Sequence, residues 1–137
     1  MTVVVDTSVL IDHLKGDDRA RRLLAAGRRR GTALCASVLT KVEVLSGTRD
    51  SEIGPTRSLL GILQWIPVSD ELAERAGALG REYLSSHPGI DPVDFVIAST
   101  VERLDAQLWT LNLKHFPMIP GLVDPYRPTG DLGSGGR

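Results

Sequence analysis

Short apolar runs alternate with amphipathic stretches along most of the chain, and this pattern predicts strands that alternate with helices. Four runs have the length and the β-branched or aromatic content of buried strands: Val3–Val5, Thr32–Ala36, Trp65–Val68 and Leu108–Leu111. Pro67 cannot donate a hydrogen bond to a neighbouring strand, so the third run belongs at a sheet edge. A further short strand is expected near Leu122–Val123. The alternation predicts an α/β sandwich on a central, mostly parallel sheet of four to five strands.

The stretches between these runs have helical spacing and helix-terminal residues. Asp17, Ser37, Ser69 and Asp91 each stand where a helix N-cap is expected, and Gly16, Gly31 and Gly47 follow helix ends. Thr48–Pro55 is expected to be a polar turn. The predicted helices are Ser8–His13, Asp18–Arg28, Ser37–Leu45, Thr56–Leu63, Ser69–Tyr83 and Asp91–Leu104.

Length and composition limit the class of protein. The 137 residues, 42% of them hydrophobic, fit one folded domain, expected over residues 1–127, with a disordered tail over residues 128–137. The single cysteine, Cys35, lies in an apolar run and predicts a buried side chain, with neither a disulfide framework nor a zinc cluster. With no basic leader and no apolar run of about 18 residues, we expect a cytoplasmic protein without a membrane span.

The net charge of −1 conceals an asymmetry between the two parts of the chain. Residues 1–50 carry nine Lys or Arg and six Asp or Glu, whereas residues 51–137 carry seven and eleven. Most of the positive charge is a cluster in the second predicted helix and just after it: Arg19, Arg21, Arg22, Arg28, Arg29 and Arg30. This cluster is either a patch for nucleic acid or a solvated helix face near the C-terminal dipole end. Aromatic residues are only 4% of the chain, which argues against base stacking on an aromatic platform.

Three carboxylates interrupt apolar runs: Asp6 ends the first strand, Glu43 lies between Val42 and Val44, and Asp94 lies before Phe95. An ionised carboxylate is costly to remove from water unless a positive charge compensates it. A divalent cation with oxygen ligands, Mg²⁺ or Mn²⁺, would compensate several carboxylates at once. Such an ion lowers the pKa of a bound water, and this chemistry suits phosphodiester hydrolysis.

Each of these acids also has a purely structural interpretation. Asp6 could cap the helix that follows it, and Glu43 could point outward from a solvated helix face. Asp91 and Asp94, with Pro92 between them, have the spacing of a capping box. The topology favours convergence of the acids on one site, because Asp6 and Asn112 both follow strands and so lie at the carboxyl edge of a parallel sheet.

The motifs around these acids resemble those of a known family. They are Val-Val-Asp-Thr-Ser-Val-Leu-Ile, then Ser-x-x-Thr-x-x-Glu-x-x-x-Gly, then Asp-Phe-Val-Ile-Ala, then Thr-Leu-Asn-x-x-His-Phe. In this order, over residues 3–120, they resemble a PIN domain, and more narrowly the VapC toxins of bacterial VapBC toxin–antitoxin pairs.

The resemblance implies a magnesium-dependent endoribonuclease, a homodimer, and inhibition by a VapB antitoxin whose C-terminal segment covers the active site. It implies that Asp6, Glu43 and Asp94 bind the metal, Mg²⁺ or in its place Mn²⁺, and that hydroxyls of Thr7 or Ser8 and of Thr110 support them.

One position departs from the family pattern. Many relatives have a fourth acid where this chain has Asn112, whose neutral carbonyl oxygen is a weaker ligand. The number of metal ions is therefore open, and Asp91 would compensate in part if it faced the cleft. Arg28, Arg29, Arg30 and Lys41 are candidates for contacts with RNA phosphates.

Two rival interpretations remain at this stage. Asn112 suits a PIN fold that binds RNA or protein without cutting it. A flavodoxin-like phospho-acceptor also has an acid after its first strand, but it would leave Glu43 without a role. Such a protein normally needs a lysine late in its sheet, and Lys114 is the only candidate for it in this sequence.

Overall fold

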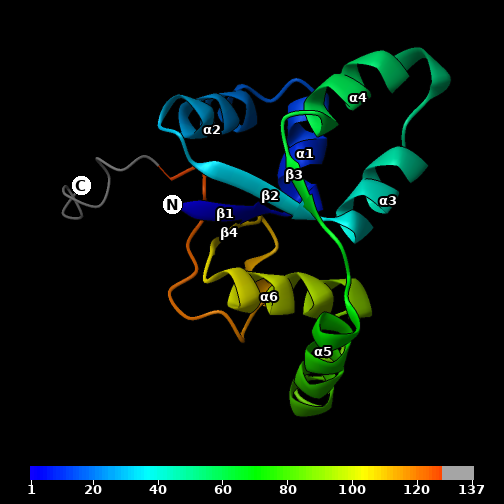
Figure 1. Cartoon of the computed structure of the whole chain (residues 1–137), viewed down its shortest axis with the longest axis vertical. Helices are drawn as coiled ribbons and strands as arrows, with labels where there is room; N and C mark the ends of the chain where they lie inside the picture. The colour runs from blue at the N-terminus through cyan, green and yellow to red at the C-terminus, as the bar shows by residue number, and fades with distance from the viewer. Residues whose placement is uncertain (128–137) are drawn as a thin grey trace.

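Four parallel strands form the centre of the molecule. In the computed structural model, which describes residues 1–127, the strands are β1 (Thr2–Val5), β2 (Ala33–Ser37), β3 (Gln64–Ile66) and β4 (Gln107–Trp109). They lie in the order β3-β2-β1-β4 (Figure 1). Val4 of β1 is paired with Cys35 on one side and with Leu108 on the other. The predicted parallel α/β sheet is confirmed, and β1 lies in its interior.

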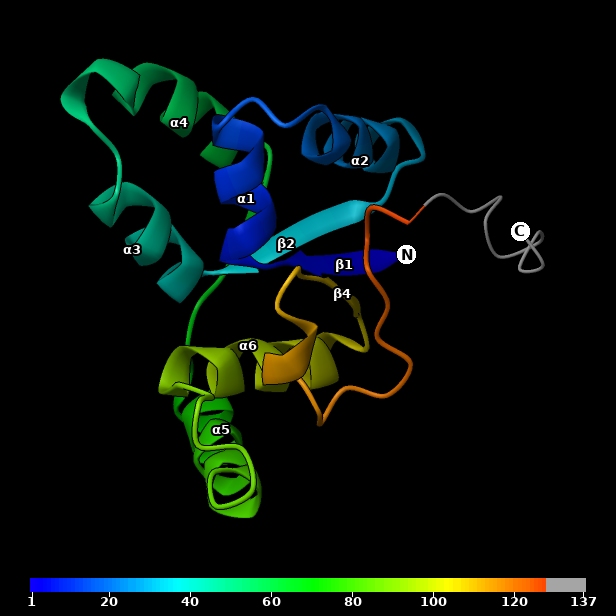
Figure 2. The same ribbon diagram turned by 180° about the vertical axis from the view of Figure 1, so that it is seen from behind.

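Helices cover both faces of the sheet. On one face lie α1 (Thr7–Leu14), α2 (Asp18–Arg29) and α4 (Ile53–Leu60), and on the other α5 (Asp70–Tyr83) and α6 (Pro92–Leu104) (Figures 1 and 2). Helix α3 (Val38–Ser46) follows β2 directly and projects beyond the carboxyl ends of the strands. Two short 3₁₀ helices, η1 (Asp50–Glu52) and η2 (Leu113–His115), precede α4 and follow β4.

Alternate residues of β1 belong to two hydrophobic cores. Val3 and Val5 pack with the cluster that includes Leu24 of α2, whereas Val4 packs with the cluster that includes Ile97 of α6. All three valines are fully buried, which explains why the strand is an uninterrupted apolar run. Burial of each such side chain contributes roughly 1.5–3 kcal/mol of hydrophobic stabilisation. This packing fixes the position at which β1 ends, and therefore the position of Asp6.

Several predicted details are confirmed. The side chains of Asp17, Ser37 and Ser69 accept hydrogen bonds from backbone N–H groups in the first turns of α2, α3 and α5. β3 lies at a sheet edge, as Pro67 directly after it indicates. Cys35 is buried and forms no disulfide.

Other details differ. The fourth strand ends at Trp109, two residues before the predicted end, because the chain turns at Thr110 to place its hydroxyl beside Asp6. Leu122 and Val123 lie outside any strand, so the described sheet has four strands. Helix α4 begins at Ile53, within the stretch expected to be a turn, because a helix tolerates Pro55 in its first turn.

Two further expectations concern the chain as a whole. Among residues 1–127, no helix is both long enough and apolar enough to cross a membrane. The tail predicted over residues 128–137 lies outside the described residues.

Candidate active site

Asp6 lies at the carboxyl end of β1, in the position of the helix N-cap of α1. Its backbone N–H donates to the carbonyl oxygen of Trp109 at 2.9 Å, so β1 and β4 stay paired up to this point. Its side chain makes no capping hydrogen bond. Instead Oδ2 accepts hydrogen bonds from Ser8 Oγ at 3.1 Å and from Thr110 Oγ1 at 2.6 Å. The capping interpretation of the Asp6 carboxylate is therefore wrong.

The two hydroxyls that contact Asp6 are themselves held by backbone groups. Ser8 Oγ accepts from the N–H of Leu111 at 3.0 Å, and Thr110 Oγ1 accepts from the N–H of Asn112 at 3.0 Å. Because each hydroxyl accepts one hydrogen bond from the backbone, its own proton is directed to the Asp6 carboxylate. This network orients a carboxylate that is only 4% exposed.

Glu43 comes to the same sheet edge from α3. Thr7 Oγ1, in the first turn of α1, donates to Glu43 Oε1 at 2.6 Å. The carboxylate therefore reaches back over the end of the sheet, although the residue is solvent-exposed. The interpretation of Glu43 as an outward-pointing surface acid is wrong.

Asp94 both caps its helix and faces the site. Asp91 Oδ1 accepts from the N–H groups of Val93 and Asp94, and Asp94 Oδ2 accepts from the N–H of Asp91 at 3.3 Å, which completes a capping box. The same Oδ2 lies 3.2 Å from Nδ1 of His115 in η2. The two interpretations of the Asp91–Asp94 pair are thus compatible.

Burial raises the pKa of the Asp94 carboxyl to about 6. Burial is the largest cause; the backbone hydrogen bond from Asp91 and the proximity of His115 oppose it, and the negative charges of Asp91 and Asp6 add to it. At neutral pH the fold therefore keeps an ionised Asp94 at an energetic cost. A cation bound beside it would remove that cost.

The three carboxylates line one cavity of about 390 Å³ at the carboxyl edge of the sheet. Its lining residues are Asp6, Thr7, Ser8, Ile11, Asp12, Glu43, Asp91, Asp94, Leu111, Asn112 and His115. The cavity thus collects five acids from three different segments of the chain. Thr110 supports it from beneath, fully buried.

The three carboxylates share one feature of hydrogen bonding. Within residues 1–127, Asp6 and Asp94 accept protein hydrogen bonds only through Oδ2, and Glu43 only through Oε1. The second oxygen of each carboxylate remains available for a ligand. No Lys or Arg of the described residues forms an ion pair with any of the three.

This donor set fits a hard divalent cation in kind, since it offers carboxylate oxygens and the amide of Asn112. However, over residues 1–127 no three Asp, Glu, His or Cys side chains are already close enough together to ligate one ion. Magnesium commonly retains several waters and takes only one or two carboxylates directly. The residues therefore suit an ion bound partly through water.

The sequence pattern assigned no role to two polar residues that line the cavity, Asp12 and His115, although His115 belongs to the motif Thr-Leu-Asn-x-x-His-Phe. Asp12 lies four residues after Ser8 on α1, so both face the same side of the helix, and this spacing was a usable signal. Tyr126, far along the chain, donates its hydroxyl to Asp12 Oδ2 at 3.0 Å. Nothing in the sequence pattern indicated this contact.

The basic residues suggested for RNA lie away from the cavity. Arg28 and Arg29 end α2 and Arg30 follows, next to the start of β2 and hence at the opposite edge of the sheet from Asp6. Lys41 Nζ lies over the Trp65 ring, 4.5 Å from its centroid, and does not line the cavity. The structure does not bring these four residues to the carboxylates.

Comparison with known proteins agrees with this fold. The PIN domain family matches residues 3–117. Ribonuclease VapC19 of Mycobacterium tuberculosis (strain ATCC 25618 / H37Rv) is 42% identical over 123 residues, which cover 90% of this chain and 98% of that protein. Ribonuclease VapC10 of the same strain is 38% identical over 128 residues, covering 93% and 96%.

Solved structures are similar in fold. A toxin–antitoxin complex from Klebsiella pneumoniae contains a chain with a TM-score of 0.76 and 31% identity, over 92% of this chain and 99% of that one. VapBC2 from Rickettsia felis, bound to a DNA fragment from its promoter, gives a TM-score of 0.74 at 23% identity over 90% and 96% of the two chains, a likeness of fold alone. The protein thus has the fold of a PIN domain, with carboxylates gathered at one sheet edge. The chain belongs to the PIN-domain family, and within it to the VapC proteins, which confirms the resemblance in its motifs.

Proposed function

We propose that this protein is the toxin of a toxin–antitoxin pair and a metal-dependent endoribonuclease that hydrolyses RNA phosphodiester bonds in the cytoplasm. One observation carries the proposal. Asp6, Glu43 and Asp94 line one cavity, and each keeps one carboxylate oxygen free of hydrogen bonds from residues 1–127. The names of the two M. tuberculosis relatives, both ribonucleases, support the choice of RNA.

The residues of the chain have distinct roles in this proposal. Asp6, Glu43 and Asp94 hold Mg²⁺ or Mn²⁺ directly or through water, and Asn112 adds a neutral oxygen ligand. Ser8 and Thr110 keep Asp6 in one orientation by donating to its Oδ2. Thr7 does the same for Glu43. When bound, the ion supplies an activated water and stabilises negative charge on the phosphate and on the leaving oxygen.

Charge balance gives a reason for the cation. The cavity brings Asp6, Asp12, Glu43, Asp91 and Asp94 to a place where a phosphodiester must also enter. Without a cation, the acids would repel the phosphate. Among residues 1–127, His115 is the only basic residue that lines this cavity.

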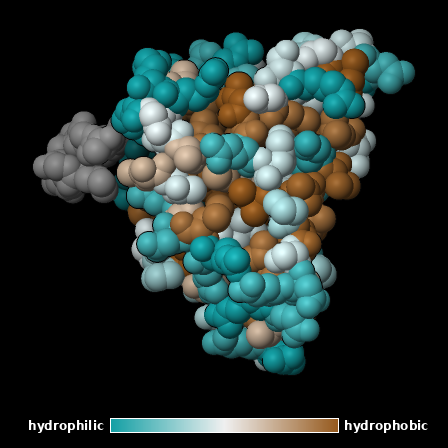
Figure 3. Space-filling view, viewed as in Figure 1, coloured by the Kyte–Doolittle hydropathy of each residue, from teal (hydrophilic) through white to brown (hydrophobic). Residues whose placement is uncertain are grey.

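Partners follow from the same assignment. We propose a VapB-type antitoxin as the inhibitor, supported by the toxin–antitoxin complex that this chain resembles at 31% identity. We also propose a homodimer. Hydrophobic surface is visible between the hydrophilic α2 and α5 regions in Figure 3, and Val42 of α3 is 59% exposed. Such surface suits a protein interface.

A second candidate is a PIN fold that binds RNA or protein without catalysis. It is favoured by Asn112 in place of an acid and by the lack, in residues 1–127, of three ligands already grouped around one point.

Cleavage assays separate the two candidates. Purified protein, freed of antitoxin, is incubated with structured RNA and either Mg²⁺, Mn²⁺ or EDTA, beside Asp6→Asn and Asp105→Asn. Asp105 is exposed, ends α6 in a left-handed conformation that Asn also tolerates, and lies at the opposite sheet edge. We expect the wild type and Asp105→Asn to cleave RNA in the presence of Mg²⁺ or Mn²⁺ and not in EDTA. Equal cleavage by Asp6→Asn would refute the catalytic assignment, and RNA binding without cleavage by any variant would support the second candidate.

A further inference from the structure

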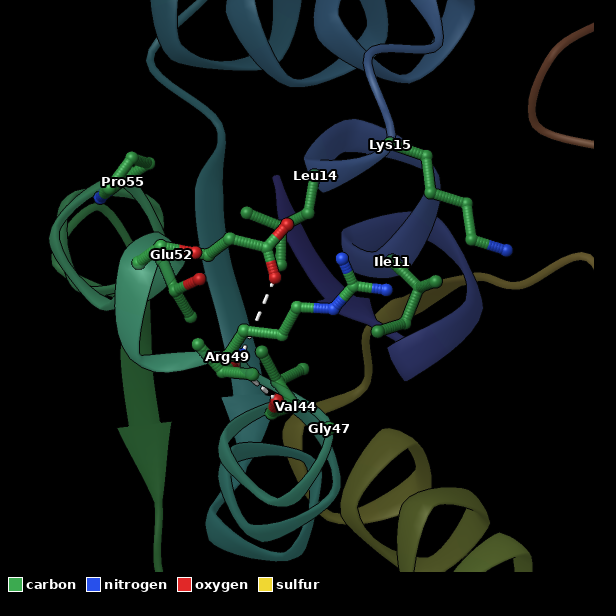
Figure 4. Close-up of a pocket in the computed structure, with 11 residues that line it drawn as sticks. Ile11, Leu14, Lys15, Val44, Gly47, Arg49, Glu52 and Pro55 are labelled. Carbon is green, nitrogen blue, oxygen red and sulfur yellow. Dashed lines mark hydrogen bonds between the residues drawn. The ribbon is translucent and has the colours of Figure 1, made fainter.

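A second cavity, of about 430 Å³, adjoins the carboxylate cavity. It lies between α1, the end of α3, η1 and the start of α4 (Figure 4). Ile11 lines both cavities, and α3 contributes Glu43 to one and Val44 to the other. The two cavities therefore share part of their wall. Its volume is in the range of small-ligand sites, about 300–1,000 Å³.

The second cavity has an apolar floor and cationic edges. Ile11, Leu14, Val44 and Pro55 supply aliphatic surface, and Arg49 and Lys15 supply positive charge. In Figure 4 the Arg49 side chain extends across the cavity towards Ile11, whereas Lys15 extends outward from the end of α1.

Arg49 has no competing ion pair in the described chain. The nearest acid of the lining, Glu52, accepts a hydrogen bond from the Arg49 backbone N–H at 3.4 Å, but its carboxylate forms no salt bridge with the guanidinium. Lys15 likewise forms no ion pair with residues 1–127. By contrast, Arg19, Arg75 and Arg103 are paired with Asp17, Glu102 and Glu71.

The position of these cations matters because RNA is a polyanion. The carboxylate cavity is strongly acidic, so the groups that attract the flanking phosphates must lie just outside it. Arg28, Arg29 and Arg30 are at the wrong edge of the sheet to do so. Arg49 and Lys15 are the Lys and Arg residues that line the adjoining cavity.

We propose that this cavity binds the nucleotide next to the scissile phosphate of a single-stranded RNA segment. The Arg49 guanidinium contacts its phosphate through paired N–H donors, and Lys15 contacts the following phosphate. The sugar and base lie on the aliphatic floor. With no aromatic residue in the lining, the subsite binds through charge and shape and selects weakly among bases. The inference rests on the proposed RNA substrate.

Binding is measured in an Asp6→Asn background, so that cleavage cannot obscure it. A short, fluorescently labelled single-stranded RNA is titrated at several salt concentrations. We expect Arg49→Gln to weaken binding roughly tenfold and to reduce the slope of log K against log salt by about 0.7, the value for one lost contact with a single strand. Arg81→Gln is the matched control, since Arg81 is exposed on α5 in the other helical layer. It should leave binding and slope unchanged.

Kinetics with Asp6 intact provide a second readout. If the subsite only binds, Arg49→Gln raises KM for RNA and leaves kcat nearly unchanged. Unaltered RNA binding and KM in Arg49→Gln would overturn the proposal, as would a variant that loses only antitoxin binding, because the cavity would then serve the protein partner. Arg49-dependent RNA binding in a protein that cuts no RNA would support the subsite while refuting the catalytic proposal.

Discussion

Thr110 and Asp6 are 104 positions apart in the sequence, yet Thr110 Oγ1 donates a 2.6 Å hydrogen bond to Asp6 Oδ2. The parallel pairing of β1 with β4 makes this contact possible, since both residues directly follow the paired strands. Thr110 is fully buried, and Oδ1 of Asp6 accepts no hydrogen bond from residues 1–127.

Replacing Thr110 by valine should weaken both the fold and the site. Valine keeps the shape but leaves a buried carboxylate short of one donor, so we expect the free energy of unfolding to fall by about 1–3 kcal/mol. Metal affinity and RNA cleavage should fall roughly 10- to 100-fold, as for other groups that orient a metal ligand. Chemical denaturation and cleavage rates measure the two effects.

Thr40→Val is the matched control. Thr40 is also fully buried, but its hydroxyl has no hydrogen-bond partner among residues 1–127. The same substitution there should leave stability unchanged or raise it. Equal destabilisation by both substitutions would show that loss of the Asp6 contact is not the cause.

Asp94 should make the metal-free protein less stable as pH rises. Its pKa is raised from 3.8 to about 6 in the folded protein, mainly by burial. Well below pH 4 the carboxyl is protonated in both the folded and the unfolded states, and the free energy of unfolding has its full value. Between pH 4 and 6 the Asp94 carboxyl ionises in the unfolded chain before it ionises in the folded protein. The free energy of unfolding therefore falls by up to about 3 kcal/mol.

Denaturant unfolding of wild type and Asp94→Asn across pH 4–7 tests this prediction. The difference in unfolding free energy between the two should change by nearly that amount and level off near pH 7, whereas the pH dependence of Asp105→Asn should match that of the wild type. A difference that does not vary with pH would mean that the pKa of Asp94 is not raised.

Asn112→Asp should strengthen metal binding. It adds a negative charge beside the free oxygens of the carboxylates, and we expect the Mg²⁺ concentration for half-maximal cleavage to fall roughly tenfold, equivalent to about 1.4 kcal/mol. Asn112→Ala should raise it. If Asn112→Asp leaves the Mg²⁺ dependence unchanged, residue 112 is not near the ion.

Tyr126 should stabilise the wall of the cavity through Asp12. Tyr126→Phe removes a hydrogen bond to an ionised acceptor at 3.0 Å and should lower the unfolding free energy by about 1–2 kcal/mol. Tyr83→Phe is the control, since the Tyr83 hydroxyl donates no hydrogen bond within residues 1–127. Thermal unfolding measures the difference, and equal effects would contradict a specific role for the Tyr126–Asp12 contact.

The sequence was sufficient to place the acids but not to orient them. Asp6 at a strand end and Glu43 inside an apolar stretch are local signals, and topology alone brings strand ends to one edge. The hydrogen bonds from Thr110 and Tyr126 depend on how β4 and the chain after it turn, which no local pattern encodes. The same topology argument applies to Arg28–Arg30: they directly precede the predicted strand Thr32–Ala36, so in a parallel sheet they lie at the opposite edge from Asp6.

Calorimetric titration of Mn²⁺ into purified, metal-free protein measures whether the carboxylates at the carboxyl edge of the sheet bind a divalent ion. We predict saturable binding to the wild type and to Asp105→Asn, and binding at least tenfold weaker in Asp6→Asn. Equal Mn²⁺ affinity in the wild type and Asp6→Asn would show that these carboxylates do not bind the ion.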